Sequence, residues 1–303
     1  MTMIKRFILF LCIAASLLAS CNAPHRSKAV LVHAHRGGAA IYPENTIEAM
    51  LYAVDLGVDY LEFDLHVSKD SQVVVSHDAY FNSQKALTPS GDTIARDSDK
   101  LYRLWNMPYD SIRKYDIGSK TNPHYPNRHN FVARLPLADA LIDSVETHIR
   151  VCHLKPVQYN IEIKSWPTKD GIFTPDYKTF ADLCMKELLS HHIGDRLLVQ
   201  CFDTRTLNYL HQKYPTVRLS YLVDNDNQTS FSDYMSRLDF VPQVYSPHYS
   251  LVNTALVDSC RAYGMALAPW TVDSHKDIRR LAALGVDAII TNQPDSAIIW
   301  LKK

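Results

Sequence analysis

The apolar positions along the chain alternate between two kinds of segment. Short stretches rich in apolar and β-branched residues are typical of strands, and between them lie stretches in which apolar residues recur every three or four positions, as in amphipathic helices. The strand-like stretches cover residues 29–34, 60–67, 158–164, 197–202, 218–222, 240–245, 266–272 and 288–291. The helix-like stretches cover residues 46–56, 137–148, 176–191, 204–213, 254–262, 275–284 and 294–301.

This alternation predicts parallel strands joined by helices. It contains about eight strand-helix units, the number that a closed TIM (β/α)8 barrel requires. An open, doubly wound sheet is the competing architecture, but no Gly-x-Gly-x-x-Gly loop follows the first strand-like stretch. We therefore expect an α/β protein with a TIM (β/α)8 barrel.

Residues 68–134 interrupt the alternation. Lys69 and Asp70 lie between two alternating apolar stretches, which predicts a hairpin turn and an antiparallel return over residues 73–75. The part from about 81 to 134 is rich in Ser, Asp, Asn, Pro and Tyr and has no long periodic element. Its many aromatic residues favour an ordered cap, inserted after the second strand, over a flexible linker.

The N-terminus has the pattern of an export signal. Lys5 and Arg6 precede an apolar run over residues 7–19, so residues 1–20 are predicted to be a signal peptide. The run is short for a bilayer span, which makes a transmembrane anchor the less favoured interpretation. Residues 18–21, Leu-Ala-Ser-Cys, resemble a bacterial lipobox, in which cleavage precedes a cysteine that is then acylated.

We accordingly expect residues 21–303 to form one barrel domain, exported and anchored to a bacterial membrane by lipid on Cys21, on the periplasmic or the outer side. Several acyl chains would give stable attachment without any membrane-inserting surface. Ordinary signal cleavage, which would leave Cys21 unmodified and the protein free, remains the alternative.

Composition narrows the choice of partners. The chain has 32 Lys and Arg against 32 Asp and Glu, with no basic block, so it lacks the electrostatic signature of a nucleic-acid binder. A small-molecule substrate is favoured. The remaining cysteines in the expected domain lack the short spacings of zinc or redox motifs, and their disulfide state stays open. They are Cys152, Cys184, Cys201 and Cys260.

Acidic residues fall on two predicted strands in the same pattern. Glu62 and Asp64 are two positions apart, which puts both carboxylates on one face of a strand, and Glu162 and Lys164 repeat the spacing on the next strand. Two like charges about 4 Å apart repel by roughly 4 kcal/mol at an effective dielectric near 20. One divalent cation would offset this repulsion, and oxygen ligands favour Mg²⁺ or Ca²⁺. A buried ion-pair network without metal is the alternative.

Two histidines lie where catalytic groups are expected. His35 and Arg36 end the first predicted strand, at the barrel end that carries active sites, and His77 ends the predicted antiparallel return. Imidazoles on opposite sides of a phosphate could act as acid and base. The chain has 14 histidines, and most histidines in a protein serve the surface or the core. We assign that role to His33, His66, His191 and His192.

These residues carry a resemblance to a known family. The chain resembles the glycerophosphodiester phosphodiesterases, whose signature has nearly the same order and spacing. The matching segments are residues 35–37, His-Arg-Gly; 43–46, Pro-Glu-Asn-Thr; 62–64, Glu-Phe-Asp; and 77–78, His-Asp. Weaker matches, including residues 160–164, 200–203, 270–272 and 291–295, extend the resemblance over most of the expected domain.

The resemblance implies a TIM barrel that hydrolyses glycerophosphodiesters to sn-glycerol 3-phosphate and an alcohol, with a divalent cation. It implies roles by position: His35 and His77 as the acid/base pair, Glu62, Asp64 and Glu162 as metal ligands, Arg36 and Lys164 as phosphate contacts, and Phe202 and Trp270 facing the glycerol. For the two aromatic residues, plain core packing is an equally good interpretation. Whether water or a neighbouring substrate hydroxyl attacks the phosphorus stays open.

Three details of the signature lead to further expectations. Cys201 replaces the family's usual serine and Asn292 a frequent aspartate, and we expect neither to touch the catalytic set. Asn45, with Glu48 three residues later, fits a capping box at a helix start.

Two other functions are kept as alternatives. A lysophospholipase D-like enzyme would need an apolar groove in the aromatic-rich insertion. A non-catalytic, lipid-anchored binding module is the other.

Overall fold

The computed structural model describes residues 29–226 and 228–302. The expected signal peptide and Cys21 lie outside the described residues.

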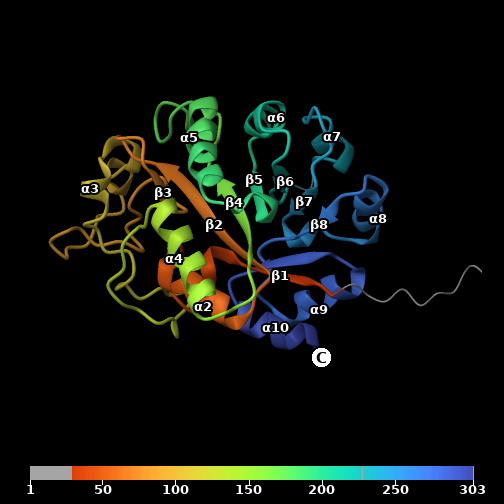
Figure 1. Ribbon diagram of the computed structural model, residues 1–303, viewed down its shortest axis with the longest axis horizontal. Helices are drawn as coiled ribbons and strands as arrows, with labels where there is room; N and C mark the ends of the chain where they lie inside the picture. The colour runs from red at the N-terminus through yellow and green to blue at the C-terminus, as the bar shows by residue number, and fades with distance from the viewer. Residues whose placement is uncertain (1–28, 227, 303) are drawn as a thin grey trace, which may run out of the picture.

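Eight parallel strands in this part of the chain form a nearly closed barrel (Figure 1). Their order around the barrel is β8-β7-β6-β5-β4-β2-β1-β9. Between the two ends of this order, the Asp287 N–H donates to the Leu267 carbonyl and the Ile290 N–H to the Pro269 carbonyl, each at 3.0 Å. The strands are β1 (Leu31–Ala34), β2 (Tyr60–Val67), β4 (Gln158–Ile163), β5 (Leu197–Cys201), β6 (Arg218–Val223), β7 (Val244–Pro247), β8 (Ala266–Leu267) and β9 (Ala288–Thr291). The expected TIM barrel is confirmed.

A helix follows each barrel strand and packs outside it. These helices are α2 (Ile47–Leu56), α4 (Ala138–Val151), α5 (Tyr177–Ser190), α6 (Thr204–Lys213), α7 (Phe231–Met235), α8 (Thr254–Ala262), α9 (His275–Leu284) and α10 (Pro294–Lys302). Short 3-10 turns are η1 (His35–Gly37), η2 (Asp99–Leu101), η3 (Leu104–Asn106), η4 (Gly194–Arg196) and η5 (Tyr249–Leu251). The sequence pattern missed α7, because five residues are too few to show a helical period. A capping box between Ser230 and Asp233 starts this helix.

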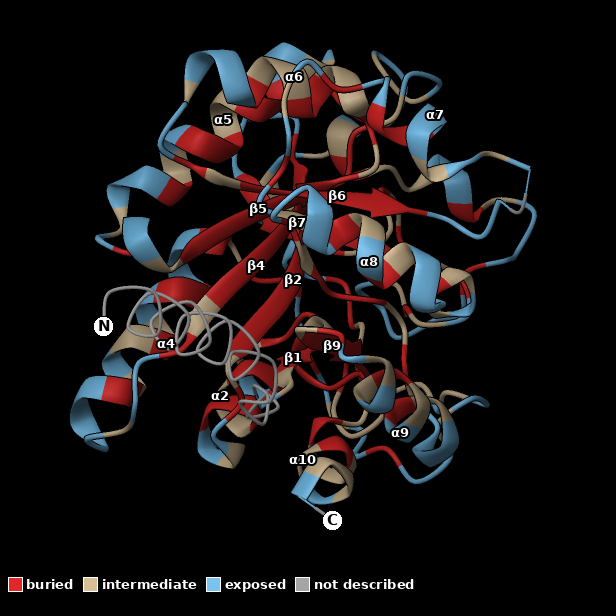
Figure 2. Cartoon of the chain, turned by 90° about the vertical axis from the view of Figure 1, so that its right-hand side faces the viewer, coloured by how far each residue is buried: buried red, intermediate tan, exposed pale blue. Residues whose placement is uncertain are grey.

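The barrel strands separate apolar from polar side chains. In β2, Leu61, Phe63 and Leu65 belong to the main hydrophobic core, and the intervening Glu62 and Asp64 point to the opposite face because strand side chains alternate. Figure 2 shows the strands buried over most of their length and the helices buried mainly on their inner sides. The barrel interior therefore receives the polar side chains of the strands.

The expected insertion after the second strand is an ordered cap. β3 (Val73–Val75) returns antiparallel to β2, and the following segment contains η2, η3 and α3 (Tyr109–Ile112) at one side of the barrel (Figure 1). A second hydrophobic cluster holds the cap, and within it the rings of Phe81 and Tyr115 stack 3.8 Å apart. The cap is therefore held together by side-chain packing, because it contains no long helix.

Candidate active site

Three buried carboxylates meet at the carboxyl ends of two neighbouring strands. Asp64 of β2 is the register partner of Glu162 of β4, and Glu62 lies one strand repeat before Asp64. One oxygen from each of the three lies within 4.8 Å of the others. The side chains of Glu62 and Asp64 are each 1% exposed, so water contributes little to their solvation.

Two cations and several neutral donors surround this trio. Lys164 Nζ lies 2.9 Å from Glu162 Oε1 and 3.6 Å from Asp64 Oδ1, and Arg36 Nε lies 3.5 Å from Asp64 Oδ2. Glu62 accepts hydrogen bonds from the Arg36 backbone N–H at 2.9 Å and from Gln200 Nε2 at 2.7 Å. Among the described residues, Asp64 Oδ1 and Glu162 Oε1 have no hydrogen-bond partner of good geometry, and both face the single ammonium group of Lys164.

The pKa values of the three acids reflect this crowding. Burial and the negative charges of Asp64 and Glu162 raise the pKa of Glu62 well above its ordinary value. Burial and Asp64 raise the pKa of Glu162 to about 7, against the opposing effect of Lys164. Burial also disfavours the charge of Asp64, but Lys164, His77 and Arg36 outweigh it and lower the pKa of Asp64. Ionising all three carboxylates at once is therefore unfavourable unless another positive charge is present.

His35 enters the site from a tight turn at the end of β1. The turn needs left-handed backbone at Arg36, with φ 53°, and at Gly37, with φ 81°. A Cβ on Gly37 would lie 2.7 Å from the Ala49 side chain, so only glycine fits. The turn brings His35 Nε2 to 3.9 Å from Glu62 Oε2.

Asn292 holds the other nitrogen of the His35 ring. The Asn292 Nδ2 group donates to Asp273 Oδ2 at 2.8 Å and to the Tyr125 hydroxyl at 2.9 Å, which turns its Oδ1 toward His35 Nδ1 at 2.6 Å. Because an amide oxygen only accepts, Nδ1 carries the proton and Nε2 offers a lone pair to the cavity. The expectation that Asn292 would not touch the catalytic set is wrong, because barrel closure brings the end of β9 beside the end of β1.

Burial and the adjacent Arg36 lower the pKa of His35 to about 3. The ring is therefore neutral near pH 7, which is the protonation state that a proton acceptor requires. By contrast, Cys201 faces the core, where its thiol donates to the Ile163 carbonyl, and it stays outside the cavity as expected.

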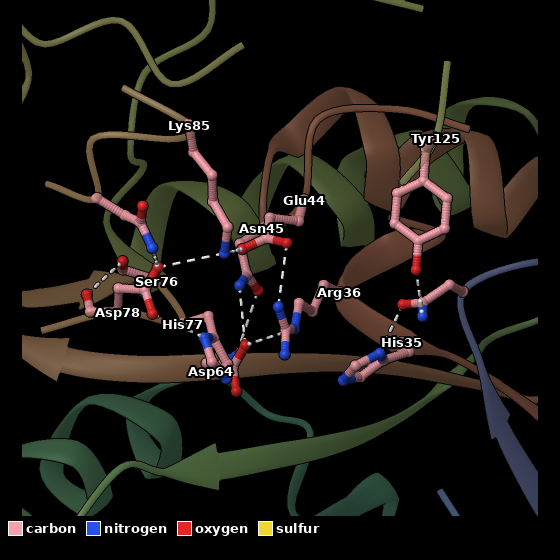
Figure 3. A network of polar contacts seen from close by, with 12 residues as sticks. His35, Arg36, Glu44, Asn45, Asp64, Ser76, His77, Asp78, Lys85 and Tyr125 are labelled. Carbon is pink, nitrogen blue, oxygen red and sulfur yellow. Dashed lines mark hydrogen bonds and ion pairs between the residues drawn. The ribbon is translucent and has the colours of Figure 1, made fainter. Parts of the chain in front are cut away.

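His77 is oriented by a carboxylate. Its Nδ1 lies 3.0 Å from Asp78 Oδ1. Lys85, from the cap, contacts Asp78 Oδ2 at 3.2 Å and Glu44 Oε1 at 2.7 Å, and the other Glu44 oxygen accepts from Arg36 Nη1 at 3.0 Å. Figure 3 shows this chain of contacts running from His77 through Lys85 to Arg36. The cap thereby fixes groups on two sides of the site, and sequence reasoning had given Lys85 and Glu44 no role in it.

Asn45 serves the site and not the helix that follows it. The N-cap of α2 is Thr46, whose side chain accepts from the Ala49 N–H at 3.2 Å, so the predicted capping box at Asn45 and Glu48 is wrong. The Asn45 amide Nδ2 instead donates to Asp64 Oδ2 at 2.9 Å, and its Oδ1 accepts from the Asp64 backbone N–H at 3.3 Å. Its backbone φ of 61° turns the side chain toward β2 and away from the position of a cap.

One cavity of about 470 Å³ adjoins both histidines, Glu62, Glu162, Arg36 and Lys164. Phe202 and Trp270 also line it, with ring centroids 5.4 Å apart and nearly perpendicular. Trp166, which the sequence gave no reason to select, stacks on Phe202 at 5.1 Å. The cavity has a charged floor and an aromatic wall, a combination suited to a small phosphate ester with apolar carbons.

Comparisons with known proteins agree with this arrangement. Residues 35–296 match the model of the glycerophosphoryl diester phosphodiesterase family. A glycerophosphodiester phosphodiesterase of Bacillus subtilis is 27% identical over 271 residues, 88% of this chain and 84% of its own. An Oleispira antarctica phosphodiesterase, solved with the product sn-glycerol-3-phosphate, is 19% identical with a TM-score of 0.70, over 90% of this chain and 97% of that one. A lysophospholipase D of Rattus norvegicus is 60% identical over 45 residues, 15% of this chain and 14% of its own.

Proposed function

The chain belongs to the glycerophosphoryl diester phosphodiesterase family, and we propose that it hydrolyses glycerophosphodiesters to sn-glycerol 3-phosphate and an alcohol, with two histidines and one divalent cation, Mg²⁺ or Ca²⁺. The observation that carries the proposal is the trio of buried carboxylates, of which Glu62 and Glu162 line the same cavity as His35 and His77. The product complex of the Oleispira antarctica relative supports the substrate class.

Glu62, Asp64 and Glu162 are the residues that would hold the cation. Their donor set is all oxygen, as Mg²⁺ and Ca²⁺ prefer, and one oxygen from each of the three lies within 4.8 Å of the others. Lys164 and Arg36 neutralise part of the acidic charge, but Arg36 is shared with Glu44. When bound, the cation would supply positive charge that binds a phosphate oxygen and stabilises the transition state.

Arg36 and Lys164 bind the phosphate. Both side chains line the cavity, and Arg36 Nε is buried without a hydrogen-bond acceptor among residues 29–226 and 228–302. A phosphate oxygen would satisfy that donor. Two fixed cations aimed at the same group offset the charge that builds on the phosphate oxygens during the reaction.

The partners of the two histidines support different roles for them. His35 is neutral and held by an amide, so its free Nε2 takes the proton of the attacking oxygen, from water or from the substrate's neighbouring hydroxyl. His77 is held by the Asp78 carboxylate, which favours the protonated ring. Burial, Arg36 and Lys164 lower the pKa of His77 below its ordinary value, although Asp64 and Asp78 oppose part of this shift. The contact with Asp78 is the ground on which we assign His77 the transfer of a proton to the leaving alcohol.

The Asn292→Ala variant should lower kcat by about 10- to 100-fold with little change in KM, because an imidazole misplaced by about 1 Å loses up to about 10²-fold in rate. Steady-state kinetics on glycerophosphoglycerol measures both constants. Tyr125→Phe is the matched control: it removes one partner of the Asn292 amide and leaves Asp273 to hold it, so its effect should be much smaller. An Asn292→Ala protein with full kcat would remove Asn292 from the mechanism.

A chelator assay tests the proposed function. The purified protein should release sn-glycerol 3-phosphate from glycerophosphodiesters with several head groups. EDTA should abolish the release, and added Mg²⁺ or Ca²⁺ should restore it. Undiminished release in EDTA would reject the proposed role of the cation. Absence of release from every substrate would reject the proposed activity.

A lysophospholipase D-like activity stands second. It is favoured by the local similarity to the Rattus norvegicus enzyme. The apolar groove it would need should come from the cap, but the cap residues that line the cavity include the charged Lys100. A charged rim suits a small polar head group better than an acyl chain.

We also propose that the protein is exported and lipid-anchored through Cys21. Its support is the sequence pattern of the first 21 residues. Within residues 29–226 and 228–302, no helix combines the length and hydrophobicity needed to cross a bilayer. Mass spectrometry of the mature N-terminus should find Cys21 as the first residue, carrying acyl chains, and an unmodified Cys21 would decide against the anchor.

A further inference from the structure

Two lysines line the outer part of the cavity without a counter-ion. Lys100 comes from η2 of the cap and Lys169 from the loop between β4 and α5, and both border the same cavity as the catalytic groups. Within the part of the chain that the structure describes, neither ammonium group forms an ion pair or a hydrogen bond. Most cavity-lining charges of this protein are paired, so two unpaired cations on one rim require an explanation.

The acids of the cavity already have partners of their own. Glu162 pairs with Lys164 at 2.9 Å, and Asp78 pairs with Lys85 at 3.2 Å. Glu62 accepts two hydrogen bonds from Arg36 and Gln200. Neither Lys100 nor Lys169 takes part in these short contacts. Burial and the nearby Lys164 lower the pKa of Lys169, although the charges of Glu162 and Asp78 oppose part of this shift.

The aromatic wall does not suit a cationic head group. Trp166, Phe202 and Trp270 form a continuous set of rings, and such rings bind quaternary ammonium groups through their faces. However, Lys169 Nζ already lies over the Trp166 ring, 5.8 Å from its centroid. The charge of Lys169 would repel a choline group bound at Trp166.

We propose that Lys100 and Lys169 form a subsite for an anionic group on the leaving alcohol, so that the preferred substrates are glycerophosphodiesters whose alcohol carries a second phosphate. This inference rests on the proposed hydrolase activity and adds the class of head group. In the reaction, water adds its oxygen to phosphorus, the bond from phosphorus to the leaving alcohol breaks, and the alcohol oxygen receives a proton. The second phosphate remains unchanged on the alcohol and serves only to bind Lys100 and Lys169.

Three substrates of graded head-group charge test this subsite. Bis(glycerophospho)glycerol carries a second anionic phosphodiester, glycerophosphoglycerol has the same glycerol leaving group without it, and glycerophosphocholine carries a cation. After correction for the two equivalent ends of the first substrate, the wild-type protein should show a kcat/KM about five- to tenfold higher for it than for glycerophosphoglycerol, as expected for two partly exposed charge contacts. High salt should reduce this ratio because it screens such contacts.

The double variant Lys100→Gln/Lys169→Gln should bring the ratio close to one. The ratio is taken within one protein preparation, so partial misfolding of a variant does not affect it. The control is Lys186→Gln/Lys276→Gln, which removes two exposed lysines that do not border the cavity and should leave the ratio unchanged.

A wild-type ratio near one, or an undiminished ratio in the Lys100→Gln/Lys169→Gln protein, would overturn the subsite. Absence of sn-glycerol 3-phosphate from all three substrates would instead overturn the proposed activity. A faster reaction with glycerophosphocholine than with bis(glycerophospho)glycerol would indicate that the aromatic wall binds cationic head groups. This result would also reject the proposal.

Discussion

The Glu162→Gln protein will bind Mg²⁺ or Ca²⁺ far more weakly and lose about 10²- to 10³-fold in kcat/KM, while its metal-free form stays as stable as the wild type. The activity loss follows from removing one of three charged ligands and is comparable to removing one preorganised electrostatic contact. The unchanged stability follows from the pKa of Glu162, which burial and Asp64 raise to about 7. Without metal, a neutral side chain at this position costs the protein little.

Isothermal titration with each cation measures the affinity, and urea unfolding in EDTA measures the stability. In the wild type, Lys164 Nζ lies 2.9 Å from Glu162 Oε1. The glutamine side chain still offers an oxygen to this ammonium group, so the variant does not leave it buried without a partner. Glu48→Gln, which removes an exposed carboxylate from the first turn of α2, is the control and should retain activity and metal binding. Ordinary cation affinity in Glu162→Gln would mean that the carboxylate trio is an ion-pair network, and the proposed metal would be rejected.

The barrel and the carboxylate trio could be predicted from the sequence because both depend on local periodicity. Glu62 and Asp64 share a face by the alternation of a strand, and parallel strands of equal register bring Glu162 beside them. The two-residue alternation of side chains along each strand therefore predicts which side chains meet at the end of the barrel.

The supporting contacts could not be predicted, because they join positions that only tertiary structure brings together. Asn292 and His35 are 257 residues apart, and their contact depends on closure of the barrel between its first and last strands. The residue type of Asn45 is typical of a helix N-cap, but its left-handed backbone directs the side chain toward Asp64. Lys85 lies in a cap without periodicity, so no pattern indicated that it would bridge Glu44 and Asp78.

The His35→Ala and His77→Ala variants should each lose about 10²- to 10⁴-fold in kcat on glycerophosphoglycerol, the usual contribution of a general acid or base. The p-nitrophenyl ester of glycerol phosphate should distinguish the roles of the two histidines, because its leaving group needs no proton. If His77 protonates the leaving alcohol, His77→Ala should recover most of the lost rate on this ester. His35→Ala should remain slow on both substrates, because activation of the attacking oxygen is still required.

His124→Ala, which removes an exposed histidine of the cap, controls for unspecific effects and should match the wild type on both esters. Recovery by His35→Ala in place of His77→Ala would exchange the two roles. Near-normal turnover of glycerophosphoglycerol by either variant would remove that histidine from proton transfer. The assignment depends on partner chemistry: the Asp78 carboxylate beside His77 stabilises its charged ring, whereas the neutral Asn292 amide beside His35 fixes a tautomer and stabilises the charged ring less than a carboxylate would.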